Sequence, residues 1–147
     1  MLSKSVGYAI RALAYLAEKD KPILVREIST ATNIPYAFLA KIINTLGRKQ
    51  IVITQRGIGG GISLAQKPES VSLSELCMAL DDPLFRKECV LGMSECPNET
   101  GGCPIHEFWS KQRDKEIEFL RKTTLASIVL AKKKPKQGAK EKNKSKP

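Results

Sequence analysis

The 147-residue sequence predicts a mainly α-helical fold with one small β-hairpin. Two observations lead to this prediction. Apolar residues recur at helical spacing through three successive segments of the first half, and two β-branched segments joined by a glycine-rich loop follow them. A chain of this length with 41% hydrophobic residues can bury one core with extensions, and not two large independent domains.

The first predicted helix begins near the N-terminus. Its apolar residues recur at spacings i, i+3, i+4 and i+7, which places them on one face. Either Ser3 or Ser5 is available to cap its first turn. The members of the apolar face are Val6, Ala9, Ile10, Leu13, Leu16 and Ala17.

Two further helices flank a tight turn. Residues 25–31 form a short predicted helix that ends near Thr32 and Asn33, residue types that suit such a turn. Pro35 opens the next helix, because proline tolerates the first helical position. The apolar stripe of that helix ends before Gly47 and consists of Leu39, Ile42, Ile43 and Leu46. A helix, a turn and a helix in this order form a helix-turn-helix.

Two short segments with strand character come next. Residues 51–55 and 62–66 are β-branched and alternate in polarity, and the loop between them is Arg56-Gly-Ile-Gly-Gly-Gly61. Three helices followed by a hairpin is the element order of a winged helix-turn-helix, in which the hairpin is the wing. A plain helical hairpin is the alternative for the helices alone, and the following hairpin disfavours it.

The second half predicts two helices separated by a cysteine-rich loop. Ser72 and Glu75 form a capping box for the first of them, whose apolar face includes Cys77, a predicted core residue. The last long helix runs from Ile105 to Thr123. The predicted divisions are 1–83 for the winged helix-turn-helix, 84–104 for the cysteine-rich loop, 105–131 for the C-terminal helix region and 132–147 for a basic tail.

The net charge of +10 is distributed unevenly. Residues 1–70 contain 10 basic and 4 acidic residues, residues 71–131 contain 7 and 10, and residues 132–147 contain 8 and 1. The basic N-terminal part favours contact with nucleic acid, although a positive surface is often simply solvated. The last segment has almost nothing apolar to bury, so we predict that it is disordered.

No segment approaches the roughly 20 apolar residues that a membrane helix requires. The apolar N-terminal run is interrupted by Arg11, and no small-residue cleavage site follows it. We therefore expect a cytoplasmic protein without membrane attachment. In that reducing compartment, the four cysteines are more naturally metal ligands, reactive thiols or core residues than disulfides.

The predicted helix-turn-helix would lie with its second helix in the major groove of double-stranded DNA. Arg56 suits insertion into the electronegative minor groove, and the glycines beside it let the backbone approach phosphates. Few side chains at the start of the helix can form bidentate contacts with bases, so wing and DNA shape contribute to selection. The candidate DNA contacts are Tyr36, Ala37, Ala40, Lys41, Arg56, Gly59 and Gly60.

Enzymatic alternatives lack support. The glycine-rich loop is not followed by Gly-Lys-Ser/Thr and does not connect a strand to a helix, so the sequence does not support a P-loop or a dinucleotide site. A thiol redox enzyme is disfavoured because the cysteines contain no C-x2-C pair. We therefore expect no enzymatic activity.

A C-x6-C-x6-C-x2-H pattern forms the second group of candidates, namely Cys89, Cys96, Cys103 and His106. Glycines and prolines between these residues give a loop that can surround a metal centre. The positive end of the helix that starts beside Cys103 favours its thiolate form. Three thiolates and an imidazole can hold an iron–sulfur cluster or a structural zinc ion, and unligated thiols can act as a redox switch. The residues alone leave these interpretations open.

Four segments of the sequence together form a specific set of motifs: Ser5-Val-Gly-Tyr-Ala-Ile-Arg-Ala-Leu, Asn33-Ile-Pro-Tyr-Ala-Phe-Leu, Arg56-Gly-Ile-Gly-Gly-Gly61 and Cys103-Pro-Ile-His106-Glu-Phe-Trp109. Over residues 1–130 they resemble the Rrf-type family of winged helix-turn-helix iron–sulfur transcription regulators, which has IscR-like and NsrR-like members. The resemblance implies a homodimer with crossing C-terminal helices, which makes residues 105–131 a dimerisation region. It also implies a palindromic DNA operator and a cluster on the loop, with [2Fe-2S] favoured over [4Fe-4S] and zinc as the alternative.

By this resemblance the metal ligands are Cys89, Cys96, Cys103 and His106. Arg56 is then the wing arginine of the minor groove. Some NsrR-like relatives take a ligand from an aspartate of the partner's first helix, but no acidic residue precedes Glu18 here. IscR-like proteins have an acidic residue in the recognition helix that helps them choose between operator types. Ala40 stands at that position here, so we do not extend this choice of operators to the present sequence. Each gap between the cysteines is also one residue longer than in IscR-like proteins.

The sequence thus predicts a bacterial DNA-binding transcription regulator whose operator binding responds to an iron–sulfur cluster. Cluster supply, redox state or nitric oxide would be the signal. The alternative is a zinc-stabilised or thiol-only winged-helix protein that binds nucleic acid without sensing a cluster.

Overall fold

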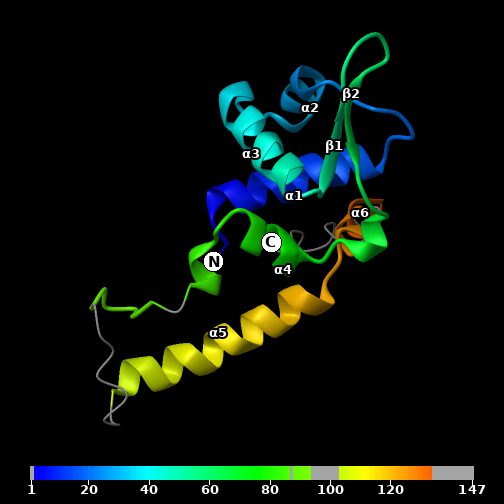
Figure 1. Cartoon of the computed structure of the whole chain (residues 1–147). Helices are drawn as coiled ribbons and strands as arrows, with labels where there is room; N and C mark the ends of the chain where they lie inside the picture. Colours follow the sequence, from blue (N-terminus) through cyan, green and yellow to red (C-terminus); the bar gives the residue numbers. More distant parts are fainter. Residues whose placement is uncertain (1, 87, 94–102, 134–147) are drawn as a thin grey trace, which may run out of the picture.

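A computed structural model describes residues 2–86, 88–93 and 103–133 of the chain. The described part is mainly helical and contains one two-stranded antiparallel sheet (Figure 1), as predicted. The helices are α1 (Lys4–Ala17), α2 (Val25–Thr32), α3 (Tyr36–Arg48), α4 (Leu73–Ala79), α5 (Pro104–Lys122) and α6 (Leu125–Lys133), with short 3-10 helices η1 (Pro68–Ser70) and η2 (Pro83–Phe85). The strands are β1 (Val52–Gln55) and β2 (Gly61–Leu64).

Helix α1 lies at the centre of the folded body. It packs against α2, α3, α4, α6 and β2, and its buried face contains most of the predicted apolar positions. Ser3 is its N-cap, because the Ser3 hydroxyl accepts the backbone N–H of Val6 at 3.4 Å. The local chemistry of the sequence therefore identified the start and the inner face of this helix.

The turn between α2 and α3 has the geometry that a helix-turn-helix requires. Asn33 adopts a left-handed conformation with φ of 52°, which ends α2 and turns the chain. Ile34 then enters the core, and its N–H donates to the carbonyl of Ser29 at 3.1 Å. Pro35 has extended ψ and caps α3 from outside, so α3 begins at Tyr36, one residue later than predicted.

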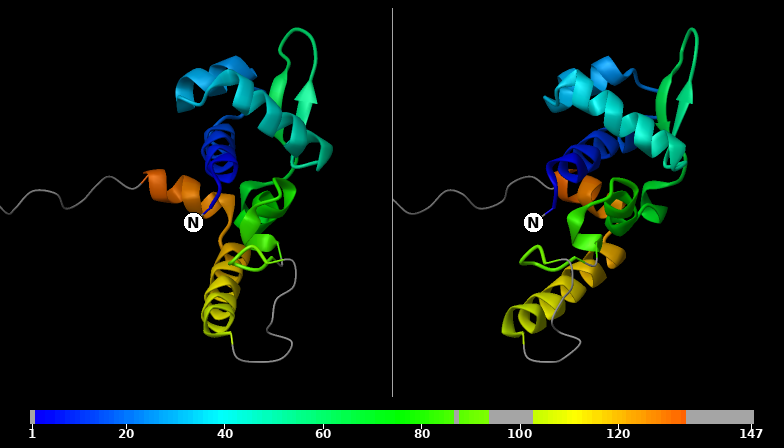
Figure 2. Two further views of the ribbon diagram at one scale, coloured as in Figure 1. Left: turned by 90° about the vertical axis from the view of Figure 1, so that its left-hand side faces the viewer. Right: turned by 60° about the vertical axis from the view of Figure 1, so that its left-hand side comes forward.

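The two strands form the predicted wing, which projects beyond α2 and α3 (Figures 1 and 2). Their register pairs Val52 with Leu64 and Gln55 with Gly61. Ile23 extends the sheet by a bridge to Ile62, with hydrogen bonds of 2.9 and 2.7 Å in the two directions. A Cβ on Gly61 would lie 2.7 Å from the Ile23 backbone, so glycine is required where the wing meets this bridge.

The second half differs from the prediction at its end. The hydroxyl of Ser72 accepts the N–H of Glu75 at 3.2 Å, as expected for the α4 cap, and α5 closely matches the predicted long helix. The chain then turns at Thr123 and Thr124, and α6 returns to pack on α1. The sequence showed no separate α6 because its residues are apolar almost without interruption and lack a one-sided period.

Part of the predicted organisation lies outside the described residues. This applies to Lys87, to residues 94–102 of the cysteine-rich loop and to the basic tail from residue 134 onward. Lys132 and Lys133, the first residues assigned to the tail, are the last residues of α6. No helix of the described part is long and apolar enough to cross a membrane.

Candidate DNA-binding surface and cysteine pocket

The start of α3 presents the predicted DNA contacts at the surface. Tyr36, Ala37 and Lys41 are exposed and Ala40 is half-buried. The opposite face of α3 is fixed in the core by Leu39, Ile42, Ile43 and Leu46. This packing orients the helix, so the exposed residues form a continuous outer face.

Two residues that the sequence analysis did not select extend this face. Asn44 and Arg48 are exposed and follow Lys41 at helical spacings of three and seven. Both line an open groove between α3 and the wing, with Ala40 and Thr54. Amide and guanidinium groups hydrogen-bond bases and phosphates, so the groove offers polar partners that the alanines lack. The spacing from Lys41 was the signal that would have found them.

The wing tip places Arg56 and Gly59 at the surface and Gly60 in a half-buried position. Gly60 has a structural reason to be glycine, because a Cβ there would lie 2.4 Å from the carbonyl oxygen of Gln55. Gly59 has φ of 75°, a conformation that other residues rarely adopt. Ile58 between the glycines was not among the predicted contacts and is fully exposed.

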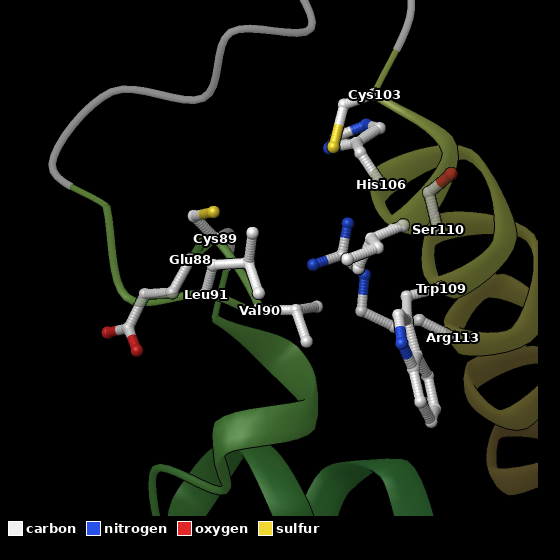
Figure 3. A pocket seen from close by; sticks show the side chains of 10 residues that line it. Glu88, Cys89, Val90, Leu91, Cys103, His106, Trp109, Ser110 and Arg113 are labelled. Atoms are coloured by element: carbon white, nitrogen blue, oxygen red, sulfur yellow. The ribbon is translucent and has the colours of Figure 1, made fainter.

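Three of the four predicted metal ligands line one pocket between the cysteine loop and the first turns of α5 (Figure 3). Cys89 comes from the loop, Cys103 is the N-cap of α5, and His106 lies in its first turn. All three are half-buried. Cys96 lies outside the described residues, so its place is not assigned.

The donor chemistry of this pocket fits a sulfur-ligated cluster. Two thiols and an imidazole line it beside the N-terminus of α5, and these residue types ligate iron in iron–sulfur proteins. Within the described ranges, no three Cys, His, Asp or Glu side chains form a group that could hold a metal ion. The described residues therefore do not by themselves form a metal site.

Cys77 is not part of this pocket. It is fully buried on α4. Burial, and after it the negative charge of Asp82, raises the pKa of the Cys77 thiol to about 11. A thiol with this pKa stays protonated at neutral pH, which agrees with the prediction of a core residue.

Arg113 is a further residue of the pocket that the sequence analysis missed. Its side chain extends from α5 into the space beside Cys89 and Cys103 (Figure 3). The Arg113 guanidinium also donates to the carbonyl of Arg86 at 3.3 Å, which holds the start of the cysteine loop against α5. Arg113 follows His106 by seven residues, which places both on the same face of α5. The sequence alone did not show that this face meets the cysteine loop.

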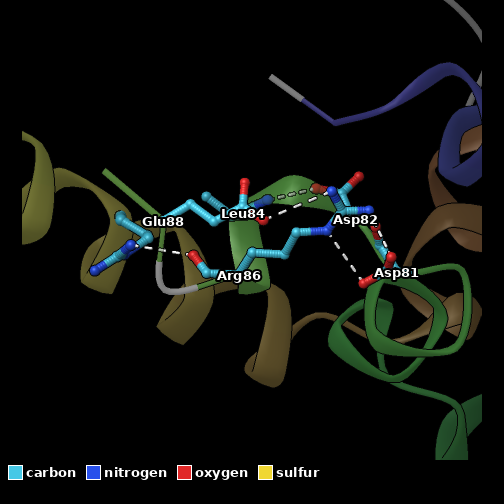
Figure 4. Close-up of polar contacts among 6 residues, drawn as sticks. Asp81, Asp82, Leu84, Arg86 and Glu88 are labelled. Atoms are coloured by element: carbon cyan, nitrogen blue, oxygen red, sulfur yellow. Dashed lines mark hydrogen bonds and ion pairs between the residues drawn. The ribbon is translucent and has the colours of Figure 1, made fainter. Parts of the chain in front are cut away.

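Polar contacts fix the segment around Asp81 to Glu88 (Figure 4), and a further hydrogen bond joins it to the start of α1. The buried carboxylate of Asp82 accepts the N–H of Ser3 at 2.8 Å and the N–H of Leu84 at 3.0 Å. Burial alone would raise the pKa of Asp82, but these hydrogen bonds outweigh it and hold the pKa below its usual value. Arg86 pairs with the exposed Asp81, so the segment before the loop is fixed at two points.

Helix α5 extends away from the body, on the side opposite the wing (Figure 2). Leu120 is its only buried residue. Two large apolar side chains of α5 face solvent in this chain: Phe108 is 63% exposed and Phe119 is 64% exposed. The two rings are eleven residues apart, three helical turns, and so lie on one side of α5.

Comparison with known proteins gives this arrangement its identity. Residues 2–131 match the Rrf2 family, which is described as iron-dependent transcriptional regulators. The chain belongs to the Rrf2 family. An Rrf2 relative from Shouchella clausii, the HTH-type transcriptional regulator NsrR, is 33% identical over 131 residues, which cover 88% of each protein. The chain is accordingly a DNA-binding transcription regulator with a helix-turn-helix, and not an enzyme.

Solved structures confirm the winged fold of this Rrf2 protein. CymR, the global cysteine regulator of B. subtilis, superimposes with a TM-score of 0.73 at 23% identity, covering 89% of this chain and 97% of CymR. IscR of T. potens gives a TM-score of 0.71 at 20% identity, with 95% and 93% covered. At these identities the likeness concerns the fold alone.

Proposed function

We propose that this Rrf2 protein is a homodimeric regulator in the cytoplasm whose operator binding responds to an iron–sulfur cluster. The proposed ligands are Cys89, Cys96, Cys103 and His106. The observation that carries the proposal is the convergence of Cys89, Cys103 and His106 from two separate segments on one pocket.

Two further findings support a cluster. The family is described as iron-dependent, and the Shouchella relative carries the name NsrR. We favour [2Fe-2S] over [4Fe-4S], because the set of three cysteines and one histidine resembles the IscR-like branch. When bound, such a cluster supplies one-electron redox chemistry at a potential that its ligands and nearby charges set.

The DNA-facing half of the proposal uses the surface opposite the pocket. α3 would enter the major groove with Tyr36, Ala37, Ala40 and Lys41, while Arg56 with Gly59 and Gly60 would enter the minor groove. A two-fold dimer through the exposed side of α5 would protect a palindrome with half-sites about one helical turn apart. The apolar exposure of Phe108 and Phe119 supports α5 as that interface.

The contacts of Asp82, Arg86 and Arg113 offer a route from pocket to DNA surface. Arg113 holds the start of the loop to α5, and Asp82 holds the segment before it to the start of α1. Because α1 packs on α2 and α3, a loop that orders around a cluster would bias the position of the recognition helix. Operator affinity would then differ between the loaded and the metal-free protein.

The visible spectrum of anaerobically purified protein tests the proposal. We expect iron-dependent charge-transfer bands in the wild type, their loss in Cys103→Ala, and their retention in the matched control Cys77→Ala. Operator affinity should change when the cluster is removed. Stoichiometric zinc with no iron-dependent absorption, together with the same operator affinity with and without metal, would show that the metal is structural and contradict the proposal.

A further inference from the structure

The tip of the wing carries an apolar side chain that the fold itself does not use. Ile58 is exposed to 109% of its reference area, more than any other large apolar residue in the described part of the chain. The glycines on either side have no neighbouring atoms within 4 Å of the position a Cβ would take. Neither the core nor the wing therefore gains packing from Ile58.

The turn holds Ile58 at the outermost position of the hairpin. The N–H of Gly60 donates to the carbonyl of Gly57 at 3.0 Å, which closes a four-residue turn with Ile58 second and Gly59 third. The φ of Gly59, 75°, is the conformation that a type II turn requires at its third residue. A defined turn therefore presents this side chain at the tip of the hairpin, which projects beyond α2 and α3 (Figures 1 and 2).

The neighbouring residues indicate what meets this side chain. Arg56 precedes the turn and is exposed, and Gly57 and Gly59 make the tip narrow. The minor groove of B-DNA is about 6 Å wide and electronegative, which suits a narrow tip with an arginine. Proteins that enter this groove frequently insert an apolar side chain such as isoleucine between base steps, where it is buried.

We propose that Ile58 is a specificity-determining DNA contact, which the wing inserts into the minor groove beside Arg56. Ile58 contributes by burial of apolar surface, and Arg56 by charge. The exocyclic amino group of guanine projects into the minor groove, so G·C pairs under the tip obstruct Ile58 whereas A·T pairs admit it. The inference uses the DNA binding of the family and is independent of the cluster.

The test compares full-length variants on the tightest duplex that the wild-type protein selects from a random DNA pool. Ile58→Ser should weaken binding about tenfold, the loss that partial burial of one isoleucine side chain predicts. The slope of affinity against salt should stay unchanged, because no phosphate contact is lost. Ile58→Leu should bind within about twofold of the wild type, since it keeps the apolar volume. Met78→Ser, at an exposed apolar position on α4, is the matched control and should bind like the wild type.

A second measurement identifies the groove. Base pairs under the tip, located by hydroxyl-radical footprinting, are replaced by inosine·cytosine or by G·C, which differ in the minor groove only by the guanine amino group. The wild type should tolerate inosine·cytosine and bind the G·C duplex more weakly, and Ile58→Ser should show a smaller G·C penalty. The proposal is overturned if Ile58→Ser binds within twofold of the wild type, if Met78→Ser loses as much affinity, or if the G·C penalty is unchanged. Circular dichroism confirms that each variant is folded.

Discussion

Asp82 joins the segment before the cysteine loop to the start of α1, across 79 positions of sequence. Its side chain is 1% exposed, and its two oxygens accept the N–H groups of Ser3 and Leu84. Asp82→Ala removes the acceptor for both donors and leaves them in a place where little water reaches them. The substitution therefore tests whether this contact stabilises the fold as its geometry indicates.

The expected loss follows from the number of bonds. A hydrogen bond to a charged group contributes about 1.5–3 kcal/mol, and the unfolded carboxylate regains water. We expect Asp82→Ala to lower the free energy of unfolding by about 3 kcal/mol, near the lower end of the two-bond range. Asp82→Asn keeps one acceptor oxygen and should lose about half as much.

The effect should depend on pH with a defined sign. The pKa of Asp82 is lower in the folded state than in the unfolded chain, so its carboxylate stabilises the fold above the unfolded pKa of about 3.9. This stabilisation is lost as pH falls through the lower, folded pKa. The difference in the free energy of unfolding between wild type and Asp82→Ala should be constant from neutral pH to about pH 5. It should become smaller below about pH 4.

Urea unfolding of the metal-free protein, followed by circular dichroism, measures these differences without a contribution from bound metal. Asp81→Asn is the matched control, because Asp81 is the adjacent acid, pairs with Arg86 at the surface and has a left-handed backbone that asparagine accepts. Its unfolding midpoint should stay close to that of the wild type. Equal midpoints for wild type and Asp82→Ala at pH 7 would refute the reasoning.

Four other outcomes follow from the same structure and sequence. Arg56→Ala should weaken binding to A·T-rich DNA more than to G·C-rich DNA and lower the salt slope by about 1, and equal losses on both would contradict the wing assignment. At pH 8 the Cys77 thiol should react with iodoacetamide only on unfolding, because its pKa is about 11. The Cys89→Ala/Cys96→Ala/Cys103→Ala variant retains Cys77 alone, and rapid labelling of this variant in its folded state would contradict the prediction. Arg113→Gln should increase proteolytic cleavage of the cysteine loop, since the donor to the Arg86 carbonyl is lost, whereas the exposed control Arg121→Gln should not. Truncation after Lys133 should flatten the salt dependence of DNA binding with discrimination between operator and random DNA retained, and lost discrimination at matched salt would show a specific role for the tail.

Sequence patterns predicted most of the helical body because the interactions that define it are local. The caps at Ser3 and Ser72 depend on hydrogen bonds three residues away, and the inner face of α1 depends on a 3.6-residue period. The wing was predictable for the same reason, since its hairpin joins neighbouring segments through Arg56 to Gly61.

Helix α6 was beyond such patterns, and the additional residues of the DNA-binding face were only partly within them. The apolar segment of α6 is buried by α1, more than a hundred residues earlier, and no local period records that contact. Asn44 and Arg48 lie on the face of α3 that helical spacing predicts, but only the groove beside the wing shows that this face continues toward the C-terminal end of the helix.

The candidate cysteine pocket divides in the same way. Residue types and spacing by themselves identified Cys89, Cys96, Cys103 and His106 as one group, because thiolates and an imidazole share a chemistry that few other roles require. Only the tertiary structure decided that Cys89 and Cys103 face one pocket with Arg113, whereas the apolar face of α4 already predicted Cys77 as a core residue. The sequence specifies what each group can bind, whereas distance, burial and the pKa that results depend on which distant segments pack together.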